Sequence, residues 1–174
     1  KKEINNSKIL DKLHLEPGKY FLISCHREEN VDNQKNFNLL IESLNKLADK
    51  YKMPIIFPIH PRTKKIYQKS KLKVDKLVNF IDPLGFIDYN KLQIESFVVL
   101  SDSGTIFEES SILNFRALNI RESHERPEAV EETAVVVTGL KIERILQGIK
   151  ILENQTTGNK RNINLVSDYN IPNV

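Results

Sequence analysis

Short apolar runs recur along the chain, separated by polar and amphipathic stretches. Each run is four to six residues long, about the length of a strand buried on both faces of a sheet. The runs are 20–25 (YFLISC), 54–59 (PIIFPI), 77–81 (LVNFI), 97–101 (FVVLS), 117–120 (ALNI) and 134–137 (AVVV). We therefore expect six strands, with the limits of the second one blurred by its two prolines.

The stretches between these runs have helical spacing. Apolar residues recur every three or four positions at Phe37, Leu40, Ile41, Leu44, Leu47 and Ala48, and again at Ile142, Ile145, Leu146 and Ile149. Further helices are expected after Pro61, from about Asp88, and from Thr105 or Ile106 to near Asn114. Strand and helix thus alternate about six times, which predicts an α/β fold with a doubly wound parallel sheet, Rossmann-like in its layers.

In such a sheet ligands bind at the carboxyl ends of the strands, so the loops that follow strands are where chemistry is expected. Five of these loops carry polar or charged motifs. They are CHREEN (25–30), HPRT (60–63), DPLGFIDY (82–89), SDSGTIFEE (101–109) and RESHERPE (121–128). All five should lie along one edge of the sheet.

Composition narrows the classes of function. The 174 residues are 40% hydrophobic and 28% charged, which suits one globular domain. The net charge is +3 with both signs interspersed, so we expect no nucleic-acid partner, and no apolar run is long enough to predict a membrane span. A single cysteine, Cys25, excludes an intramolecular disulfide and favours the cytoplasm. The first residue, Lys1, suggests a piece of a longer protein.

The SDSGTIFEE motif predicts an anion site at the start of a helix. The amides of Ser103, Gly104 and Thr105 would be unsatisfied donors there, and the glycine would allow a phosphate to approach the backbone closely. Glu108 and Glu109 would repel a phosphate, so a useful role for one of them is to accept hydrogen bonds from a ribose diol. A simple helix cap explains the same letters and remains open.

The RESHERPE motif supplies Arg121 and Arg126, whose planar guanidinium groups suit phosphate oxygens. Surface salt bridges with the nearby glutamates are the alternative. His26, at the end of the first strand, suits an acid, a base or a hydrogen-bond donor, although a single histidine is more often a structural or solvent-exposed residue. The separations of His26, His60 and His124 match no metal-binding motif, so we expect no metal.

Taken together, HREEN, HPRT, PLGFIDYNKLQ and SDSGTIFEESSILNFRALNIRESHERPEAVE resemble the non-hydrolysing UDP-N-acetylglucosamine 2-epimerase family, over nearly the whole chain. The last run is most similar to the branch that forms UDP-N-acetyl-L-fucosamine, by epimerising C2 of UDP-2-acetamido-2,6-dideoxy-L-talose for capsule and O-antigen synthesis. The resemblance implies that residues 1–174 are the C-terminal, UDP-binding half of a glycosyltransferase-B-type enzyme, without its N-terminal domain.

The resemblance also implies roles for individual residues. By motif, the family's UDP contacts fall on Leu84, Tyr89, Ser103, Gly104, Thr105, Glu109 and Arg126. The first two would meet uracil through their backbone, the next three the diphosphate, Glu109 the ribose hydroxyls, and Arg126 the phosphates. His26 matches the family's active-site histidine. Thr105 departs from the family pattern, because many relatives have a second glycine there.

The implied reaction removes UDP from C1 together with the C2 proton, giving a 2-acetamidoglycal, and then adds UDP back after protonation on the opposite face. The family's catalytic carboxylates lie in the N-terminal domain, so we expect this chain to bind UDP weakly and to turn over nothing. His26 would assist by donating to the β-phosphate or to a sugar hydroxyl.

The expected partners are a UDP-sugar substrate and the chain's own N-terminal domain, with no nucleic acid, no membrane and no cofactor. A homodimer of the full-length enzyme is compatible with the resemblance. Two other functions stay open: the nucleotide-sugar domain of a glycosyltransferase of the same architecture, and a non-catalytic UDP-sugar-binding module.

Overall fold

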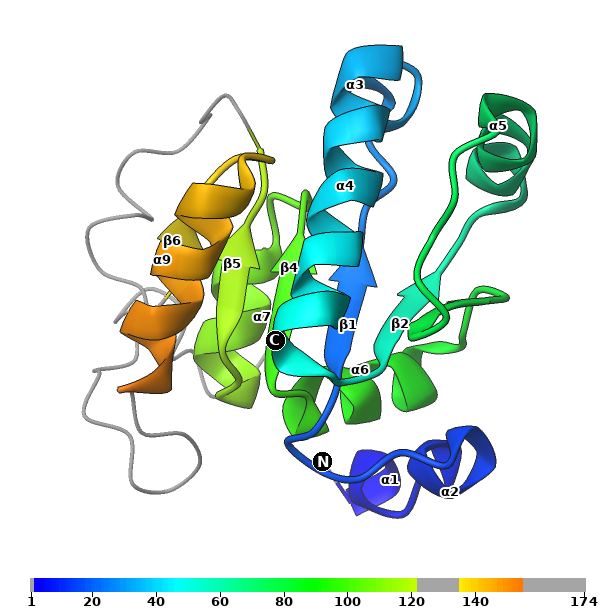
Figure 1. Cartoon of the computed structure of the whole chain (residues 1–174). Helices are drawn as coiled ribbons and strands as arrows, with labels where there is room; N and C mark the ends of the chain where they lie inside the picture. Colours follow the sequence, from blue (N-terminus) through cyan, green and yellow to red (C-terminus); the bar gives the residue numbers. More distant parts are fainter. Residues whose placement is uncertain (1, 122–134, 155–174) are drawn as a thin grey trace.

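The computed structural model describes residues 2–121 and 135–154, which form one parallel six-stranded sheet in the order β3-β2-β1-β4-β5-β6 (Figure 1). The strands are β1 (Phe21–Ser24), β2 (Ile55–Pro58), β3 (Val78–Ile81), β4 (Val98–Ser101), β5 (Ala117–Asn119) and β6 (Val136–Val137). The order reverses direction between β1 and β4, so a crevice opens at their carboxyl ends. The predicted doubly wound parallel sheet is confirmed.

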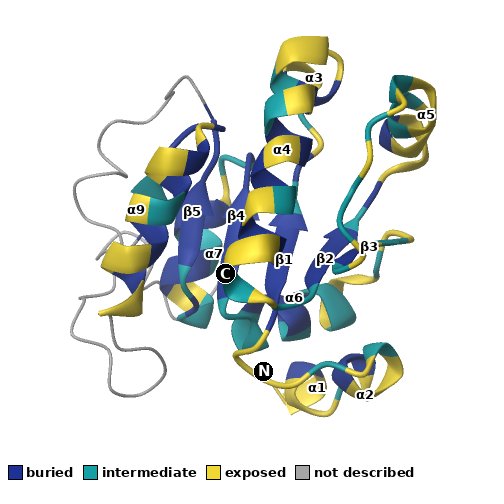
Figure 2. Cartoon of the chain, viewed as in Figure 1, coloured by how far each residue is buried: buried dark blue, intermediate teal, exposed yellow. Residues whose placement is uncertain are grey.

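Helices cover both faces of this sheet. In Figure 1, α4 (Gln34–Tyr51) and α9 (Ile142–Glu153) lie in front of the strands, and α6 (Phe86–Glu95) and α7 (Ile106–Leu113) lie behind them. The helix predicted after Pro61 is α5 (Pro61–Ser70), which connects β2 to β3. Buried surfaces concentrate on the strands, and the helices expose their outer sides (Figure 2).

Alternate residues of each strand enter two different cores. On β1, Phe21 and Ile23 pack with the helix pair α4 and α9, whereas Leu22 packs with α6 and α7. All three side chains are fully buried. Because successive side chains of a strand point to opposite faces, a continuous apolar run is what a sheet covered on both sides requires.

Helix α9 approaches the sheet very closely at Gly148. A Cβ atom at this position would lie 2.8 Å from Cδ2 of Leu118 and 2.9 Å from Cγ2 of Thr138. Only the missing side chain of glycine leaves room for this contact. The last predicted helix therefore lies directly on β5 and β6.

Three short helices were not expected from the sequence. They are α1 (Lys2–Asn5), α2 (Ile9–Leu13) and α3 (Glu28–Val31). Each is too short for a recognisable 3.6-residue period, and α1 and α2 gain stability from tertiary contacts. Ile9 and Leu10 pack in the same core cluster as Leu92 of α6, and the Ser7 hydroxyl donates to Asp88 Oδ1 at 2.5 Å.

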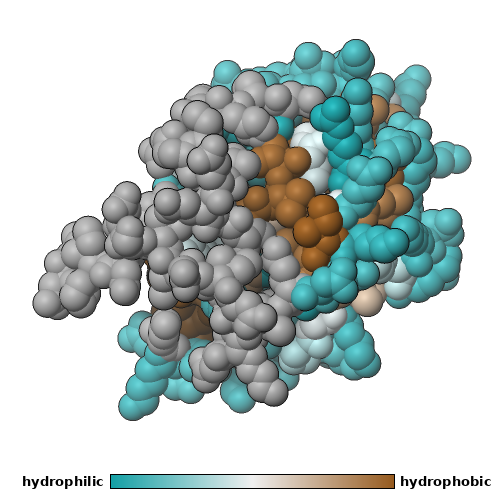
Figure 3. All heavy atoms as spheres, turned by 90° about the vertical axis from the view of Figure 1, so that its left-hand side faces the viewer, coloured by the Kyte–Doolittle hydropathy of each residue, from teal (hydrophilic) through white to brown (hydrophobic). Residues whose placement is uncertain are grey.

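The side of the molecule that carries α9 and β6 is partly apolar. Figure 3 faces this side and shows apolar atoms gathered among polar ones. Ile151 of α9 is 54% exposed, and Val136, Val137 and Leu146 are half-buried. Within the described part of the chain, no helix is both long enough and apolar enough to cross a membrane.

Candidate functional site

The centre of the site is Asp102, which follows β4 and is fully buried. Strands β1 and β4 are parallel neighbours, so the residues after them meet at the crevice. The Asp102 amide donates to the Ser24 carbonyl oxygen at 3.0 Å. Its carboxylate turns toward the loop after β1 and accepts from the amides of His26 (3.1 Å) and Arg27 (3.0 Å) and from Nδ2 of Asn30 (3.1 Å). The backbone of the HREEN motif thus wraps around one carboxylate.

His26 stands at the mouth of this crevice. Its side chain is 59% exposed, and Nδ1 lies 3.4 Å from Asp102 Oδ1. With Arg27, Glu28 and Glu29 it lines an open depression of about 370 Å³. One nitrogen of the ring thus lies near a buried carboxylate, and most of the side chain is exposed. Such an imidazole is well placed to exchange a proton with a ligand.

The turn from Ser103 to Thr105 is held together by its own hydroxyl groups. The Ser103 amide donates to Ser101 Oγ at 3.1 Å, and the Thr105 amide donates to Ser103 Oγ at 3.3 Å. The two hydroxyls of Ser103 and Thr105 are themselves 2.8 Å apart. The expectation that these amides lack partners is therefore wrong for two of the three, because serine and threonine hydroxyls bond readily to nearby backbone.

Helix α7 begins at Ile106, with Thr105 as its N-cap, as predicted. The Glu109 amide donates to the Thr105 carbonyl oxygen at 2.9 Å, so the N-terminal turn of the helix begins directly after Gly104. A Cβ built at Gly104 would lie 3.8 Å from Nη2 of Arg27. The turn before α7 thus combines helix-terminal amides with a guanidinium group from the neighbouring loop.

The carboxylate of Glu109 is held on both sides. Oε1 accepts from the Thr105 hydroxyl and Oε2 accepts from Nε2 of Gln93, both at 2.6 Å. Gln93 comes from α6 and is fully buried, whereas Glu109 is half-buried. Each carboxylate oxygen has a second lone pair, so Glu109 has a fixed orientation and still has acceptor capacity for a ligand.

Of the two expected uracil contacts, Leu84 lies in the loop after β3 and Tyr89 lies in the first turn of α6, and both side chains are turned inward. Leu84 and Tyr89 are half-buried and pack on the core beneath α6 and α7. Burial is the main reason that the pKa of the Tyr89 hydroxyl rises to about 12, while the nearby side chains of Ser24 and Gln93 lower it. A neutral phenol therefore lies near the end of β1 and near Gln93.

Other expected residues lie apart from this cluster or outside the described part. Arg126 belongs to residues 122–134, which lie outside the described residues. Arg121 is 5% exposed, and its Nε lies 3.3 Å from Glu29 Oε1, so it takes part in an ion pair at the edge of the depression. His60 caps α5 by accepting from the Arg62 amide at Nδ1, 3.3 Å away. Within residues 2–121 and 135–154, no group of three potential ligands gathers to hold a metal ion.

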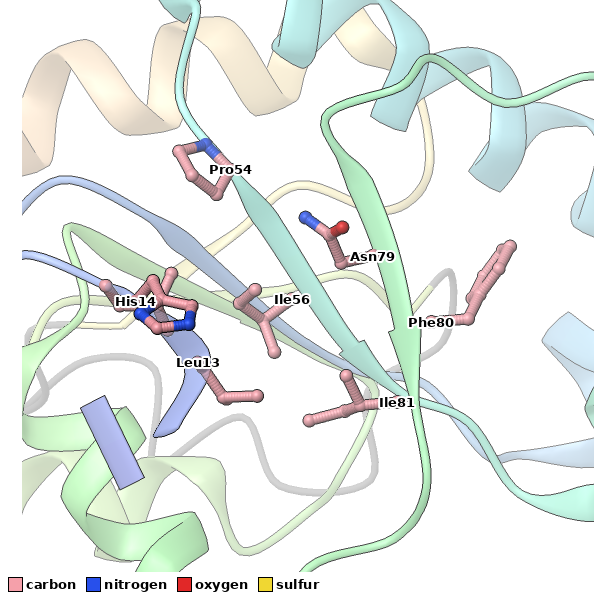
Figure 4. Close-up of a pocket in the computed structure, with 8 residues that line it drawn as sticks. Leu13, His14, Pro54, Ile56, Asn79, Phe80 and Ile81 are labelled. Carbon is pink, nitrogen blue, oxygen red and sulfur yellow. The ribbon is translucent and has the colours of Figure 1, made fainter. Parts of the chain in front are cut away.

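A second hollow, of about 240 Å³, lies beside β2 and the edge strand β3 (Figure 4). The side chains of Leu13, Ile56 and Ile81 border it, with His14 and Asn79 among its few polar groups. None of the expected site residues lines it. It is a separate feature, on the face of the sheet where α2 and α6 pack.

Sequence reasoning missed three residues of the site. Arg27 and Asp102 were quoted within motifs but were given no role, and the same is true of Gln93, the last residue of PLGFIDYNKLQ. The available signal for Arg27 was its position next to His26, and that for Asp102 was its position next to Ser103. Gln93 had no such signal, because only the packing of α6 against α7 brings it to Glu109.

Comparison with known proteins identifies the family of the chain. A family model described as UDP-N-acetylglucosamine 2-epimerase matches residues 1–173. The chain belongs to this family. The expectation drawn from its motifs is confirmed at the level of the family.

Relatives of known sequence and structure give the same result. The UDP-N-acetylglucosamine 2-epimerase of Methanocaldococcus jannaschii is 36% identical over 140 residues, which are 78% of this chain and 38% of that protein. The structure of the Rickettsia bellii UDP-N-acetylglucosamine 2-epimerase is similar with a TM-score of 0.85 and 47% identity, covering 97% of this chain and 45% of that one. The M. jannaschii enzyme in complex with UDP-GlcNAc and UDP gives a TM-score of 0.77 at 32% identity, over 90% of this chain and 45% of that one. This chain thus spans less than half the length of these relatives.

Proposed function

We propose that this chain is the C-terminal, UDP-binding half of a nucleotide-sugar 2-epimerase that inverts C2 of a UDP-2-acetamido sugar. The observation that carries the proposal is the meeting of three kinds of group at one crevice: helix-terminal amides with a guanidinium, a fixed carboxylate, and an accessible imidazole. The family assignment and the relative in complex with UDP-GlcNAc and UDP support it.

The diphosphate would bind at the turn before α7. Amides at the helix start and the positive end of the helix dipole favour an anion, and Gly104 leaves space for close approach. Arg27 Nη2 lies next to this backbone and adds a full positive charge. The 3.3 Å bond from the Thr105 amide to Ser103 Oγ is long, so an anionic phosphate oxygen is a stronger acceptor that can replace the hydroxyl. Arg126 completes the proposed phosphate contacts.

The ribose would bind at Glu109. The bonds from Thr105 and Gln93 each use one lone pair of a different carboxylate oxygen, which leaves both oxygens able to accept from a hydroxyl. A vicinal diol supplies two such donors at the right separation. The backbone around Leu84 and Tyr89 would meet the uracil ring on the same edge of the sheet.

In the proposed reaction the C1–O bond breaks with its electron pair going to UDP, while a base removes the C2 proton and a double bond forms between C1 and C2. UDP then adds back to C1 and a proton returns to C2 on the opposite face. The developing charge lies on the diphosphate, so the amides and Arg27 stabilise the transition state. His26 contributes hydrogen bonding or proton exchange at the β-phosphate or a sugar hydroxyl. The base for C2 belongs to the N-terminal domain.

Within this reaction we propose UDP-2-acetamido-2,6-dideoxy-L-talose as the substrate, for capsule or O-antigen synthesis, on the motif run that ends in HERPEAVE. Its alternative is UDP-N-acetylglucosamine, which the names of the relatives support. The two sugars differ at C6 and in ring configuration. The test is to give each UDP-sugar to the full-length enzyme and to follow inversion at C2 by NMR.

Titration calorimetry of this chain with UDP tests the binding half of the proposal, with CDP and inorganic pyrophosphate as comparison ligands. Binding of UDP in preference to both supports it, and equal binding of pyrophosphate contradicts a nucleotide site. An epimerisation assay on the same sample should show no turnover. Measurable turnover by this chain alone would contradict the assignment of the C2 base to the N-terminal domain.

A further inference from the structure

We propose that Asp102 is a positioning residue for His26: it keeps the imidazole proton on Nδ1 and presents Nε2 to the ligand. This inference rests on the proposed function, because it describes how that site holds its histidine. Asp102 itself is fully buried and reaches the ligand only through the loop that it supports.

The two oxygens of the carboxylate have different surroundings. Oδ2 accepts from four groups: Sγ of Cys25 at 3.1 Å, the amides of His26 at 3.1 Å and Arg27 at 3.0 Å, and Nδ2 of Asn30 at 3.1 Å. Within the described part of the chain, Oδ1 accepts only a shared bond from the His26 amide, at 3.2 Å. Oδ2 therefore has no acceptor position left. Oδ1, the oxygen near the imidazole, can still accept a hydrogen bond.

The imidazole nitrogen near Oδ1 is Nδ1, at 3.4 Å. A carboxylate oxygen can only accept, and a nitrogen lone pair pointed at it would be repelled, so Nδ1 carries the hydrogen. The distance exceeds that of a well-formed N–H···O bond, and such contacts commonly shorten when the ligand binds. The neutral ring therefore has its lone pair on Nε2.

Among the described residues, the groups that hydrogen-bond to the Asp102 carboxylate are all donors. Cys25 belongs to this set, because burial and the charge of Asp102 raise the pKa of its thiol well above the usual range. The thiol therefore stays protonated and donates. The amides of His26 and Arg27 are also used up by Asp102, so they are not donors for a ligand.

With Nδ1 held near Asp102, Nε2 is the atom of His26 that exchanges a proton with the ligand. The His26 side chain is largely exposed and borders the open depression, and Nδ1 is the nitrogen near the buried carboxylate, so Nε2 is the nitrogen left for a ligand. In the neutral ring it accepts a proton from a sugar hydroxyl, and in the protonated ring it donates to the β-phosphate. The same carboxylate also holds the Arg27 amide. Asp102 therefore helps to position both the imidazole of His26 and the Arg27 guanidinium beside Gly104.

Long-range ¹H–¹⁵N NMR correlations of the histidine rings in this chain test the tautomer directly, with His26→Gln identifying the signal. The expected result for the wild type is a proton on Nδ1. In Asp102→Asn the amide oxygen should take the place of Oδ2, with its four donors, and the NH₂ group should then donate to Nδ1 and move the ring proton to Nε2. Cys25→Ala is the matched control, since it removes one donor from the same carboxylate and should leave the tautomer unchanged.

A wild-type ring protonated on Nε2 overturns the inference, and so does an unchanged tautomer in folded Asp102→Asn. If Asp102→Asn does not fold, the wild-type tautomer alone decides. UDP titration of the same wild-type sample separates the two proposals: an Nδ1–H ring without UDP binding sinks the proposed function, and UDP binding with an Nε2–H ring sinks only the role of Asp102.

In the full-length enzyme, kcat of Asp102→Asn should fall by about 100-fold, with a smaller change in KM, because a wrong tautomer removes most of what an acid–base group supplies. If Asp102 acts through the imidazole, adding Asp102→Asn to His26→Ala should reduce kcat little further. Independent, multiplying losses in the double variant would instead assign Asp102 a merely structural role.

Discussion

The crevice at the ends of β1 and β4 and the hollow beside β2 and β3 are both concave, yet they differ in what they can bind. The crevice brings together the charged or polar side chains of His26, Asp102 and Glu109, and the carboxylates of Asp102 and Glu109 are held by hydrogen bonds. The hollow is bordered mainly by apolar side chains such as Leu13 and Ile56 (Figure 4). A diphosphate needs converging donors, so the crevice suits it despite being the more open of the two.

The difference has a physical origin in the sheet. At the carboxyl edge the loops leave the strands beside the start of α7, where amides face outward, and polar side chains there stay in contact with water or with one another. Beside the edge strand β3, apolar side chains of α2 pack against apolar side chains of the sheet. The first region should therefore control affinity for UDP, and the second should control stability.

The largest effect is expected from Ile56→Ala, which truncates a side chain that is 2% exposed and borders the hollow. The free energy of unfolding should fall by about 2–5 kcal/mol, measured by urea denaturation. The affinity of the folded protein for UDP should not change. Ile112→Ala, at a position 48% exposed, is the control and should cost less than about 0.5 kcal/mol. A weaker UDP affinity in folded Ile56→Ala would contradict the separation of the two regions.

Arg27→Ala should have the converse effect. Losing a charge-assisted contact to phosphate weakens binding by about 1.5–3 kcal/mol, so the Kd for UDP should rise roughly 10- to 100-fold by calorimetry. Stability should change little, because the Arg27 amide that Asp102 holds is retained. Arg62→Ala is a matched control: its exposed guanidinium pairs with Glu28 at the start of α3 and with Asp32 just after that helix. Equal losses in both variants would indicate general electrostatic attraction instead of a specific contact.

Alkaline pH tests two tyrosine hydroxyls, that of Tyr89 near the crevice and that of Tyr20 in the core under α6. Burial raises the pKa of Tyr89 to about 12, and it raises that of Tyr20, whose hydroxyl donates to the Leu92 carbonyl at 2.7 Å. In the unfolded chain both ionise near pH 10. Their stabilising contribution is therefore complete below pH 10 and is lost as pH rises toward 12, with a slope of up to about 1.4 kcal/mol per pH unit for each tyrosine.

Urea denaturation between pH 8 and pH 12 measures this slope. Tyr89→Phe should make it shallower above pH 10 and should not alter the pH dependence below that value. The same slope in Tyr89→Phe and the wild type would show that the Tyr89 hydroxyl does not remain protonated in the fold.

The smallest effect is expected from Glu109→Gln. The wild type should bind UDP more tightly than 2′-deoxy-UDP, and the substitution should reduce this preference by about 1 kcal/mol, or roughly fivefold, because an amide accepts one of the two hydroxyl bonds less well. Competition titrations with the two nucleotides measure the ratio. Glu95→Gln, a carboxylate that pairs with Lys91, should leave it unchanged. No preference for ribose in the wild type would remove Glu109 from the proposed site.

Much of the fold could be predicted from the sequence because strand and helix periods are local properties. The runs around Phe21, Ile55 and Val98 became central strands, and the spacing from Phe37 to Ala48 became α4. The start of α7 was also predictable, since glycine, hydroxyl and acidic residues mark a helix N-terminus within a few positions. Helices α1, α2 and α3 were not predictable, because four or five residues carry no period.

The tertiary structure alone decided the partners of the site. Asp102 meets the His26 amide across 76 sequence positions, and Gln93 meets Glu109 from a different helix. It also turned the Tyr89 side chain into the core and set Arg27 beside Gly104. Such pairs depend on which strands become neighbours in the sheet, and that choice is made by the packing of the whole chain rather than by any local pattern.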